Sequence, residues 1–237
     1  MRLLKENYDG LQEISTISRD LKAILLEPDI QKALQNKDFN TIYVRLPSNL
    51  ASQFTQLMNS LDIDPLNYLD YYIPQYFLAY TTVKSIDIPD HIKEIGDSAF
   101  SDCSYLEYIT IPDSVTSIDN SVFYNCSNLK SITIPDKVTR IYSFTFYNCS
   151  SLKSITISGD IRTIDNYAFR GCSDLTSVTM SNRVKHIGNW AFKNCISLTS
   201  INYTGTKDQW SKIKLEDEWD ENSPIKTIHC IDGDITL

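Results

Sequence analysis

The sequence predicts an α/β solenoid. We expect a right-handed coil with a parallel β-sheet on one face, short helical turns on the other, and an α-helical cap at the N-terminal end. Two observations predict it. A residue pattern of constant length recurs five times without an insertion. Each copy joins an alternating apolar segment, typical of a strand, to a polar residue that can start a turn. Units this short cannot bury their own apolar faces, so they are expected to stack.

The cysteines set the length of the repeat. Cys103 and Cys126 lie 23 positions apart, and the same interval separates each following pair. A phenylalanine stands three residues before every cysteine of this series, and a leucine stands three residues after it. The columns are Cys103, Cys126, Cys149, Cys172 and Cys195; Phe100, Phe123, Phe146, Phe169 and Phe192; and Leu106, Leu129, Leu152, Leu175 and Leu198. Columns that share one period indicate five copies of a single structural unit.

Each copy contains one predicted strand. Apolar and polar residues alternate in it, as in Ile109-Thr110-Ile111 and Ile132-Thr133-Ile134, which is typical of a strand with one buried face. The threonine points outward, and its β-branched side chain suits an exposed pleated surface. Proline follows the strand at positions 89, 112 and 135, where it ends strand pairing because it has no N–H to donate. Strands stacked in register lie about 4.8 Å apart and form a parallel sheet.

The second predicted element of each copy is a short helical turn that carries the phenylalanine. One polar column precedes it, and reads Asp97, Asn120, Ser143, Asn166 and Asn189. Side chains of these types accept hydrogen bonds from the free N–H groups of a starting turn. The helical turns are therefore expected on the face opposite the sheet.

Written as one unit, the repeat reads I-x-I-P-D-x-V-x-x-I-x-x-x-A-F-x-x-C-S-x-L-x-x, and residues 109–126 and 132–149 keep it best. This run resembles the BspA-type leucine-rich repeat of bacterial and phage-like proteins. The resemblance implies a leucine-rich-repeat solenoid, and adhesion to host proteins where such repeats are secreted. Segments around Gly205, Trp210 and Cys230 resemble the C-terminal cap that follows such repeats. Two copies depart from the pattern, with Ser158-Gly159 and Ser181-Asn182 in place of Pro-Asp.

Three regions are predicted: an N-terminal helical cap segment at 1–80, the solenoid at 81–203, and a C-terminal cap at 204–237. Within the first region, residues 41–47 have the same strand-then-proline pattern as the repeats. Residues 48–61 show the apolar spacing of an amphipathic helix, and residues 17–26 and 30–34 suggest two more short helices. A solenoid needs its open ends covered, which explains a cap at each end.

Composition excludes several functions. With 22 basic and 30 acidic residues the net charge is −8, which argues against direct binding of nucleic acid or a membrane surface, because both need clustered cations. The seven glycines form no G-x-G, so loops that cradle nucleotide phosphates are excluded. Residues 1–9 include acidic residues and lack the apolar core of a signal peptide, and no transmembrane stretch is present. A cytoplasmic location is expected. A chain whose signal peptide had been removed would look the same, and would then be a secreted adhesin.

The repeat cysteines permit disulfides, a metal array or core packing. Side chains stacked in parallel, in a reduced compartment, disfavour disulfides. Zinc needs convergent ligands, and no C-x-x-C is present. We expect a ladder of buried free thiols. Cys230 follows His229, but adjacent strand residues face opposite sides and form no catalytic pair. His91 and His186 show no metal spacing. No catalytic residue, cofactor or metal site is therefore predicted, and the chain is expected not to be an enzyme.

Two surfaces are candidates for binding a protein partner. The sheet face offers hydroxyls flanked by charged and aromatic side chains, and its candidate residues are Tyr108, Thr110, Lys130, Thr133, Lys153 and Thr156. The face of the helical turns offers an aromatic column, and its candidates are Phe144, Tyr167 and Trp190. Exposed aromatics often anchor protein interfaces. The opposing interpretation is that these rings half-bury one another between coils.

The leading hypothesis is a non-catalytic scaffold that binds an intracellular protein through its repeat surface. One concrete form is a phage or bacterial inhibitor of a host factor, and nucleic-acid mimicry by the acidic C-terminal cap extends it. The alternatives are a structural or assembly module, with a homodimer formed through the N-terminal helices, and an enzyme with its site in residues 1–80.

Overall fold

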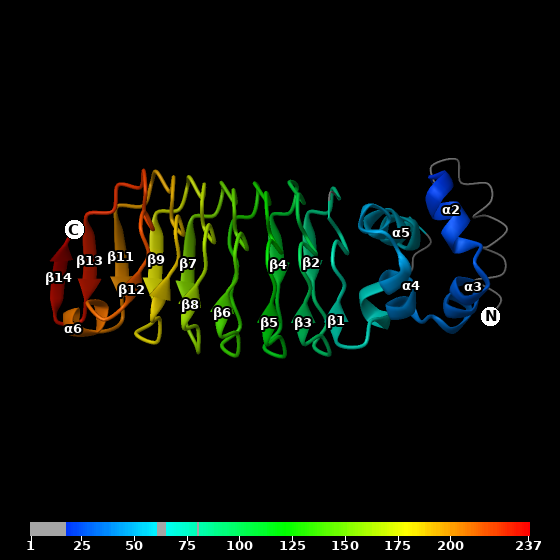
Figure 1. Ribbon diagram of the computed structural model, residues 1–237, viewed down its shortest axis with the longest axis horizontal. Coiled ribbons are helices and arrows are strands. Elements are labelled where there is room, and N and C mark those ends of the chain that lie inside the picture. The colour runs from blue at the N-terminus through cyan, green and yellow to red at the C-terminus, as the bar shows by residue number, and fades with distance from the viewer. Residues whose placement is uncertain (1–17, 61–64, 80) are drawn as a thin grey trace.

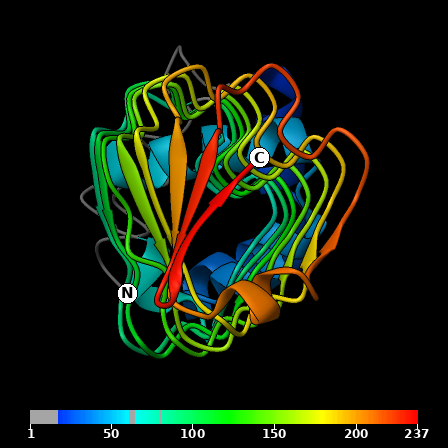
Figure 2. The ribbon, with the colours of Figure 1, turned by 90° about the vertical axis from the view of Figure 1, so that its left-hand side faces the viewer.

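The computed structural model describes residues 18–60, 65–79 and 81–237, and shows an elongated solenoid with a helical segment at its N-terminal end (Figure 1). The helical segment contains α2 (Arg19–Leu25), α3 (Pro28–Asn36), α4 (Phe39–Arg45), α5 (Ser48–Ser60) and the 3₁₀ helix η1 (Pro65–Tyr68). Viewed from the C-terminal end, successive coils superpose around a common interior (Figure 2). The repeat pattern of the sequence therefore becomes a stack of nearly identical coils.

The main sheet lies along one side of the stack. Its strands are β2 (Ser85–Asp87), β4 (Tyr108–Thr110), β7 (Ser154–Ile157), β9 (Ser177–Met180), β11 (Ser200–Tyr203), β13 (Thr227–Cys230) and β14 (Gly233–Thr236). They form two hydrogen-bonded groups, β2-β4 and β7-β9-β11-β13-β14. Within these groups all neighbours are parallel except β13 and β14, which form a closing hairpin. Residues 131–134 form only a bridge from Ser131 to Tyr108. The predicted parallel sheet is confirmed, and we call its solvent side the main sheet face.

A second series of strands runs along another side, so most coils have two strands rather than the single one predicted, and the coil of residues 131–141 has a strand only in this second series. These are β1 (Tyr72–Ile73), β3 (Glu94–Ile95), β5 (Ser117–Ile118), β6 (Arg140–Ile141), β8 (Thr163–Ile164), β10 (His186–Ile187) and β12 (Lys214–Leu215). They form two parallel groups, β1-β3-β5 and β6-β8-β10-β12. The apolar pairs that precede the turns supply their buried residues, such as Ile118 and Ile141. We call the solvent side of this series the second sheet face.

The predicted helical turn around each phenylalanine is wrong in detail. Residues 97–101 and their equivalents form consecutive tight turns, with no α- or 3₁₀-helix assigned in residues 81–203. Their N–H groups are satisfied by the next coil: Phe100 N–H donates to the Val122 carbonyl at 3.0 Å, and Asp102 N–H to the Tyr124 carbonyl at 2.7 Å. The Asp97 column therefore does not cap helices. We call the solvent side of these segments the turn face.

The turns explain a column that the sequence pattern left unexplained. The residue before each cysteine has a positive φ, between 55° and 77°, as in Asn125 and Gly171. Glycine, asparagine and aspartate tolerate this left-handed conformation best. The column reads Asp102, Asn125, Asn148, Gly171 and Asn194. Its amides also connect coils, since the Asn148 side chain donates to Asn125 Oδ1 at 3.1 Å.

The interior is a set of stacked ladders. The repeat phenylalanines are almost completely buried, and neighbouring rings are stacked, with the Phe146–Phe169 centroids 5.2 Å apart at 8°. The repeat cysteines are buried and free. Each thiol donates to a carbonyl of the preceding coil, as from Cys126 Sγ to the Phe100 oxygen at 3.2 Å. The expected ladder of packed thiols is confirmed, and it hydrogen-bonds buried backbone as well as filling space.

The N-terminal region combines correct and incorrect predictions. Helices α2, α3 and α5 occur where apolar spacing predicts them. Residues 41–47 do not form a strand, because α4 occupies Phe39–Arg45 with Asp38 as its N-cap, accepting from Thr41 N–H at 3.1 Å. The solenoid also begins before residue 81, since β1 pairs with β3. Thr81 takes the cysteine position of this first coil, with its Oγ1 3.6 Å from Cys103 Sγ.

The C-terminal segment covers the other end of the core. A short helix, α6 (Lys207–Trp210), starts with reciprocal hydrogen bonds between Thr206 and Gln209. Trp210 and Trp219 are buried, and Trp219 packs edge-on against Phe192 with centroids 6.0 Å apart. Indole rings replace the missing next coil, which is how this region closes the phenylalanine ladder.

Candidate functional site

The main sheet face presents a regular array of hydroxyl groups. The strands alternate exposed and buried residues, with Thr110, Thr133 and Thr156 exposed between buried isoleucines. None of these three hydroxyls has a hydrogen-bond partner among the residues that the structure describes. Thr110 and Thr156 lie on β4 and β7, and Thr133 occupies the equivalent position of the coil between them. This face therefore offers free donors and acceptors at regular intervals on rigid backbone.

A charged aromatic cluster borders these hydroxyls. Tyr108 is 52% exposed, and the Lys130 ammonium lies 5.3 Å from its ring centroid, a cation–π contact. Lys130 also forms an ion pair with Glu107, which lowers the pKa of the Glu107 carboxyl through the hydrogen bond and charge of Lys130. Lys153 is exposed one coil further along. All six predicted residues of the sheet surface thus lie on the main sheet face.

The aromatic column of the turn face is a continuous ring stack. The centroids of Phe144 and Tyr167 are 4.7 Å apart at 7°, and those of Tyr167 and Trp190 are 5.0 Å apart at 24°. A second stack joins Tyr124 to Tyr147 at 4.8 Å. All five rings are half-buried. Because their planes lie against one another, the faces of the inner rings are covered and mainly ring edges meet solvent.

The stack ends in a polar network. Trp190 Nε1 donates to Glu218 Oε2 at 2.8 Å and to Glu221 Oε2 at 2.7 Å. Lys193 donates to the same Glu221 oxygen at 2.6 Å. This hydrogen bond from Lys193 and that from Trp190 lower the pKa of the Glu221 carboxyl. The indole N–H, the usual polar handle of an interface tryptophan, is therefore engaged within the chain.

These aromatics also occupy strained backbone. Phe144, Tyr167 and Trp190 have φ values of 59°, 61° and 54°, a conformation that costs an ordinary residue about 1–2 kcal/mol. Hydrogen bonds to the next coil hold it, such as Tyr167 N–H to the Asn189 carbonyl at 3.0 Å. Ring stacking offsets part of the strain. The geometry matches the interpretation that these rings half-bury one another between coils.

Two histidines have carboxylate partners. His229 Nδ1 lies 2.9 Å from Asp234 Oδ1 across the closing hairpin, and His186 Nε2 lies 3.0 Å from Glu216 Oε1. Burial raises the pKa of the Cys230 thiol, the opposite of what an activated nucleophile needs. Across the described ranges no group of three or more His, Cys, Asp or Glu side chains is arranged to hold a metal ion.

A family model for the BspA-type leucine-rich repeat region matches residues 71–199 as six copies. The chain belongs to this family. The sixth copy is the first coil, in which Thr81 replaces cysteine and which the cysteine period therefore misses. In the sequence this copy can be recognised by Ile73, which is equivalent to Ile95 of the next coil and lies 22 residues before it.

Solved structures of similar fold come from bacteria. A leucine-rich cell surface protein from Faecalibacterium prausnitzii is 36% identical, with a TM-score of 0.54, over 56% of this chain and 35% of that one. A leucine-rich repeat protein from Eubacterium ventriosum is 24% identical, with a TM-score of 0.50, over 65% of this chain and 48% of that one. The chain thus spans about a third and about half of their lengths.

No curated protein sequence matches the chain. Among the described residues, no helix has the length and apolar character needed to cross a bilayer. Fold and family are established by these comparisons. The chain is a leucine-rich-repeat scaffold.

Proposed function

We propose that the chain is a non-catalytic scaffold that binds a protein partner through the main sheet face. The observation that carries this proposal is the row of exposed, unpaired hydroxyls at Thr110, Thr133 and Thr156, beside the exposed Tyr108. Tyrosine is enriched among the residues that dominate binding energy. A rigid surface also loses little conformational entropy when it binds.

The turn face supports the proposal less. Its rings stack on each other, and the Trp190 N–H is bonded to Glu218 and Glu221. Replacing such a ring would disturb the fold as well as any interface. The predicted residues Phe144, Tyr167 and Trp190 are therefore proposed to stabilise the stack, and the six predicted residues of the main sheet face to contact the partner.

The test compares two arginine variants in the same coils. Thr133→Arg with Thr156→Arg places two bulky cations on the main sheet face, whereas Thr139→Arg places one at an exposed position of the second sheet face. Proteins recovered from cells that produce the chain are compared by mass spectrometry. We expect a partner that binds the wild type and Thr139→Arg but not the double variant. Equal recovery by all three, with unchanged urea midpoints, would contradict use of the main sheet face.

Cell fractionation distinguishes two possible locations at which the chain would meet such a partner. The first is an intracellular partner, with the chain as a bacterial or phage inhibitor of a host factor. The second is adhesion at the cell surface, which the description of the F. prausnitzii structure as a cell surface protein favours. Recovery of the chain in the cytoplasmic fraction supports the first setting, and recovery in the envelope or medium supports the second.

A structural or assembly role is the remaining alternative. Light scattering over a range of protein concentrations distinguishes it from the scaffold. A concentration-dependent dimer, together with no partner recovered by the wild type, would favour assembly.

A further inference from the structure

A basic strip runs along the second sheet face of this acidic protein. It comprises residues 137–140, 160–163, 183–186 and 212–214, which contain or lead into β6, β8, β10 and β12. These segments hold seven Lys or Arg residues and a single Asp, whereas the whole chain has 22 basic and 30 acidic residues. The seven cations are Lys137, Arg140, Arg162, Arg183, Lys185, Lys212 and Lys214, and all are exposed. Cations thus outnumber carboxylates within these four segments, in contrast to the chain as a whole.

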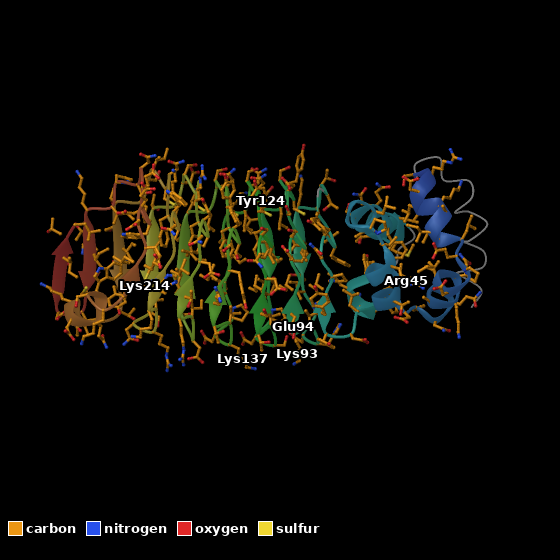
Figure 3. The ribbon with its side chains drawn as sticks, viewed as in Figure 1. Arg45, Lys93, Glu94, Tyr124, Lys137 and Lys214 are labelled. Atoms are coloured by element: carbon orange, nitrogen blue, oxygen red, sulfur yellow. The ribbon has the colours of Figure 1, made fainter. Side chains whose placement is uncertain are left out.

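Strand pairing orders this strip along the axis of the stack. Arg140 pairs with Thr163, Thr163 with His186, and His186 with Lys214. Neighbouring strands lie about 4.8 Å apart, so each coil adds cations at a nearly constant rise. Lys137 and Lys214, labelled in Figure 3, lie at different points along the length of the solenoid. The strip therefore has the form of a line of charge parallel to the axis.

Contacts within the chain satisfy only part of this charge. Arg140 belongs to the fold, because its guanidinium donates to both oxygens of the buried Asp165 carboxylate at 2.7 and 2.8 Å. Arg183 pairs with Asp160 at 3.0 Å, Lys212 pairs with Asp208 at 2.6 Å, and Lys214 pairs with Glu216. Except for that of Glu216, the side chains of these three pairs are more than half exposed. Such pairs are weak in water and can exchange for another anion.

Two cations of the strip are free. Within the described residues, no carboxylate lies within 4.0 Å of the Lys137 or Arg162 charge. The Lys185 ammonium contacts only a carbonyl, that of Asn182 at 3.2 Å. Thr139 is exposed among them and adds a hydroxyl that can bond a polar ligand.

Charge density identifies the kind of polyanion. Double-stranded DNA carries a charge about every 1.7 Å of its axis, far denser than the cations of this strip. A polysaccharide with one carboxylate on each sugar spaces its charges at intervals comparable with the coils, and its hydroxyls complement Thr139. We propose that the second sheet face binds a linear acidic polysaccharide lying along the solenoid axis. The proposal is independent of protein binding at the main sheet face.

The test is titration calorimetry of the full chain with polygalacturonate, a uniformly carboxylated probe, and with neutral dextran. We expect binding of polygalacturonate that weakens as salt rises, since exposed charges are screened, and no binding of dextran. The double variant Arg162→Gln, Lys185→Gln is expected to bind about tenfold more weakly, from the loss of two exposed ionic contacts. The matched control, Lys84→Gln with Lys226→Gln, removes two exposed cations beside the main sheet and is expected to bind like the wild type.

Urea midpoints of both double variants establish that the fold is intact. Equal losses in the two variants, or no loss in either, would overturn the assignment to the second sheet face. Tighter binding of poly-L-glutamate or of double-stranded DNA than of polygalacturonate would overturn the assignment to a polysaccharide.

Discussion

Two aromatic ladders follow the axis of this solenoid with nearly the same geometry and different surroundings. The buried ladder is formed by the five repeat phenylalanines, and the surface ladder by Phe144, Tyr167 and Trp190. In the buried ladder, Phe146 and Phe169 stack at 5.2 Å and 8°. In the surface ladder, Phe144 and Tyr167 stack at 4.7 Å and 7°. The repeat alone imposes this geometry, because equivalent side chains of parallel coils must lie over one another. Ring stacking is therefore a consequence of the period, and burial decides how much each ring contributes to stability.

The backbone beneath the two ladders also differs. The surface rings occupy positive-φ positions, whereas no repeat phenylalanine of the buried ladder does. Four of the buried phenylalanines instead supply a carbonyl to a thiol of the next coil, and the Phe192 carbonyl accepts from the Ser223 hydroxyl. The core ladder thus combines apolar burial with satisfied backbone, and the surface ladder balances stacking against strain.

The largest expected effect separates the two ladders directly. Phe146→Ala should lower the free energy of unfolding by about 4 kcal/mol, because it leaves a cavity among fully buried side chains. Tyr167→Ala should lower it by about 1.5 kcal/mol, mostly through lost ring stacking. Urea unfolding followed by circular dichroism measures both. Equal losses would show that burial does not distinguish the ladders.

The thiol ladder should make the core sensitive to alkaline pH. Burial raises the pKa of the Cys103 thiol from its ordinary value of 9.0 to about 11, and raises those of Cys126, Cys149 and Cys172 as well. These raised values favour the folded state fully below pH 9. Above pH 9 unfolded thiols ionise while folded ones do not, so stability falls by about 1.4 kcal/mol per pH unit for each thiol.

Urea midpoints measured between pH 8 and 10 test this dependence. Cys149→Ala should cost about 2 kcal/mol at pH 7, because it removes the hydrogen bond to the Phe123 carbonyl and leaves a small void. The same variant should show a shallower loss above pH 9. A slope identical to that of the wild type would contradict the contribution of Cys149.

The polar column beside the surface ladder gives a smaller effect. Asn148 has a φ of 55°, so Asn148→Ala should cost about 1 kcal/mol more than Asn148→Gly, since glycine adopts this conformation without strain. Both variants lose the same amide bond to Asn125, which makes them matched controls. Equal thermal midpoints would show that the conformation carries no strain.

The smallest effect is expected at the end of the surface ladder. Trp190→Phe keeps a stacked ring but loses the N–H bonds to Glu218 and Glu221, and should cost about 0.5 kcal/mol because both carboxylates remain partly in water. Chemical denaturation at low and high salt measures it. A loss as large as that of Tyr167→Ala would mean that the polar network, rather than stacking, holds the surface ladder.

Much of this structure follows from the constant spacing of equivalent residues in the sequence. The constant spacing of Cys103 and its equivalents predicts the stack, and the Ile-Thr-Ile segments predict which side chains are buried. The first coil is missed because Thr81 stands where cysteine is expected. Residues 41–47 mislead because an alternating pattern of that length also fits a helix packed in a core, and the Asp38 cap decides in favour of α4.

The candidate surfaces also combine features that the sequence predicts with features that it does not. Exposure of Thr133 and Thr156 follows from strand alternation. The engagement of Trp190 by Glu218 and Glu221 does not, because those carboxylates lie about one coil later in a segment that breaks the repeat. The basic strip is only partly visible in the sequence. Arg162 and Lys185 lie one period apart, but residues 212–214 fall outside the repeat, and only the pairing of β10 with β12 aligns them with the strip.

By itself, then, the sequence determines the repeat, the buried columns and the family, because a fixed period forces equivalent residues into equivalent environments. The tertiary structure alone decides the second series of strands, the tight turns in place of helical ones, and which polar groups remain free. Those features depend on backbone hydrogen bonds and contacts between coils. No single unit contains both partners of such a contact, so its own residues cannot specify them.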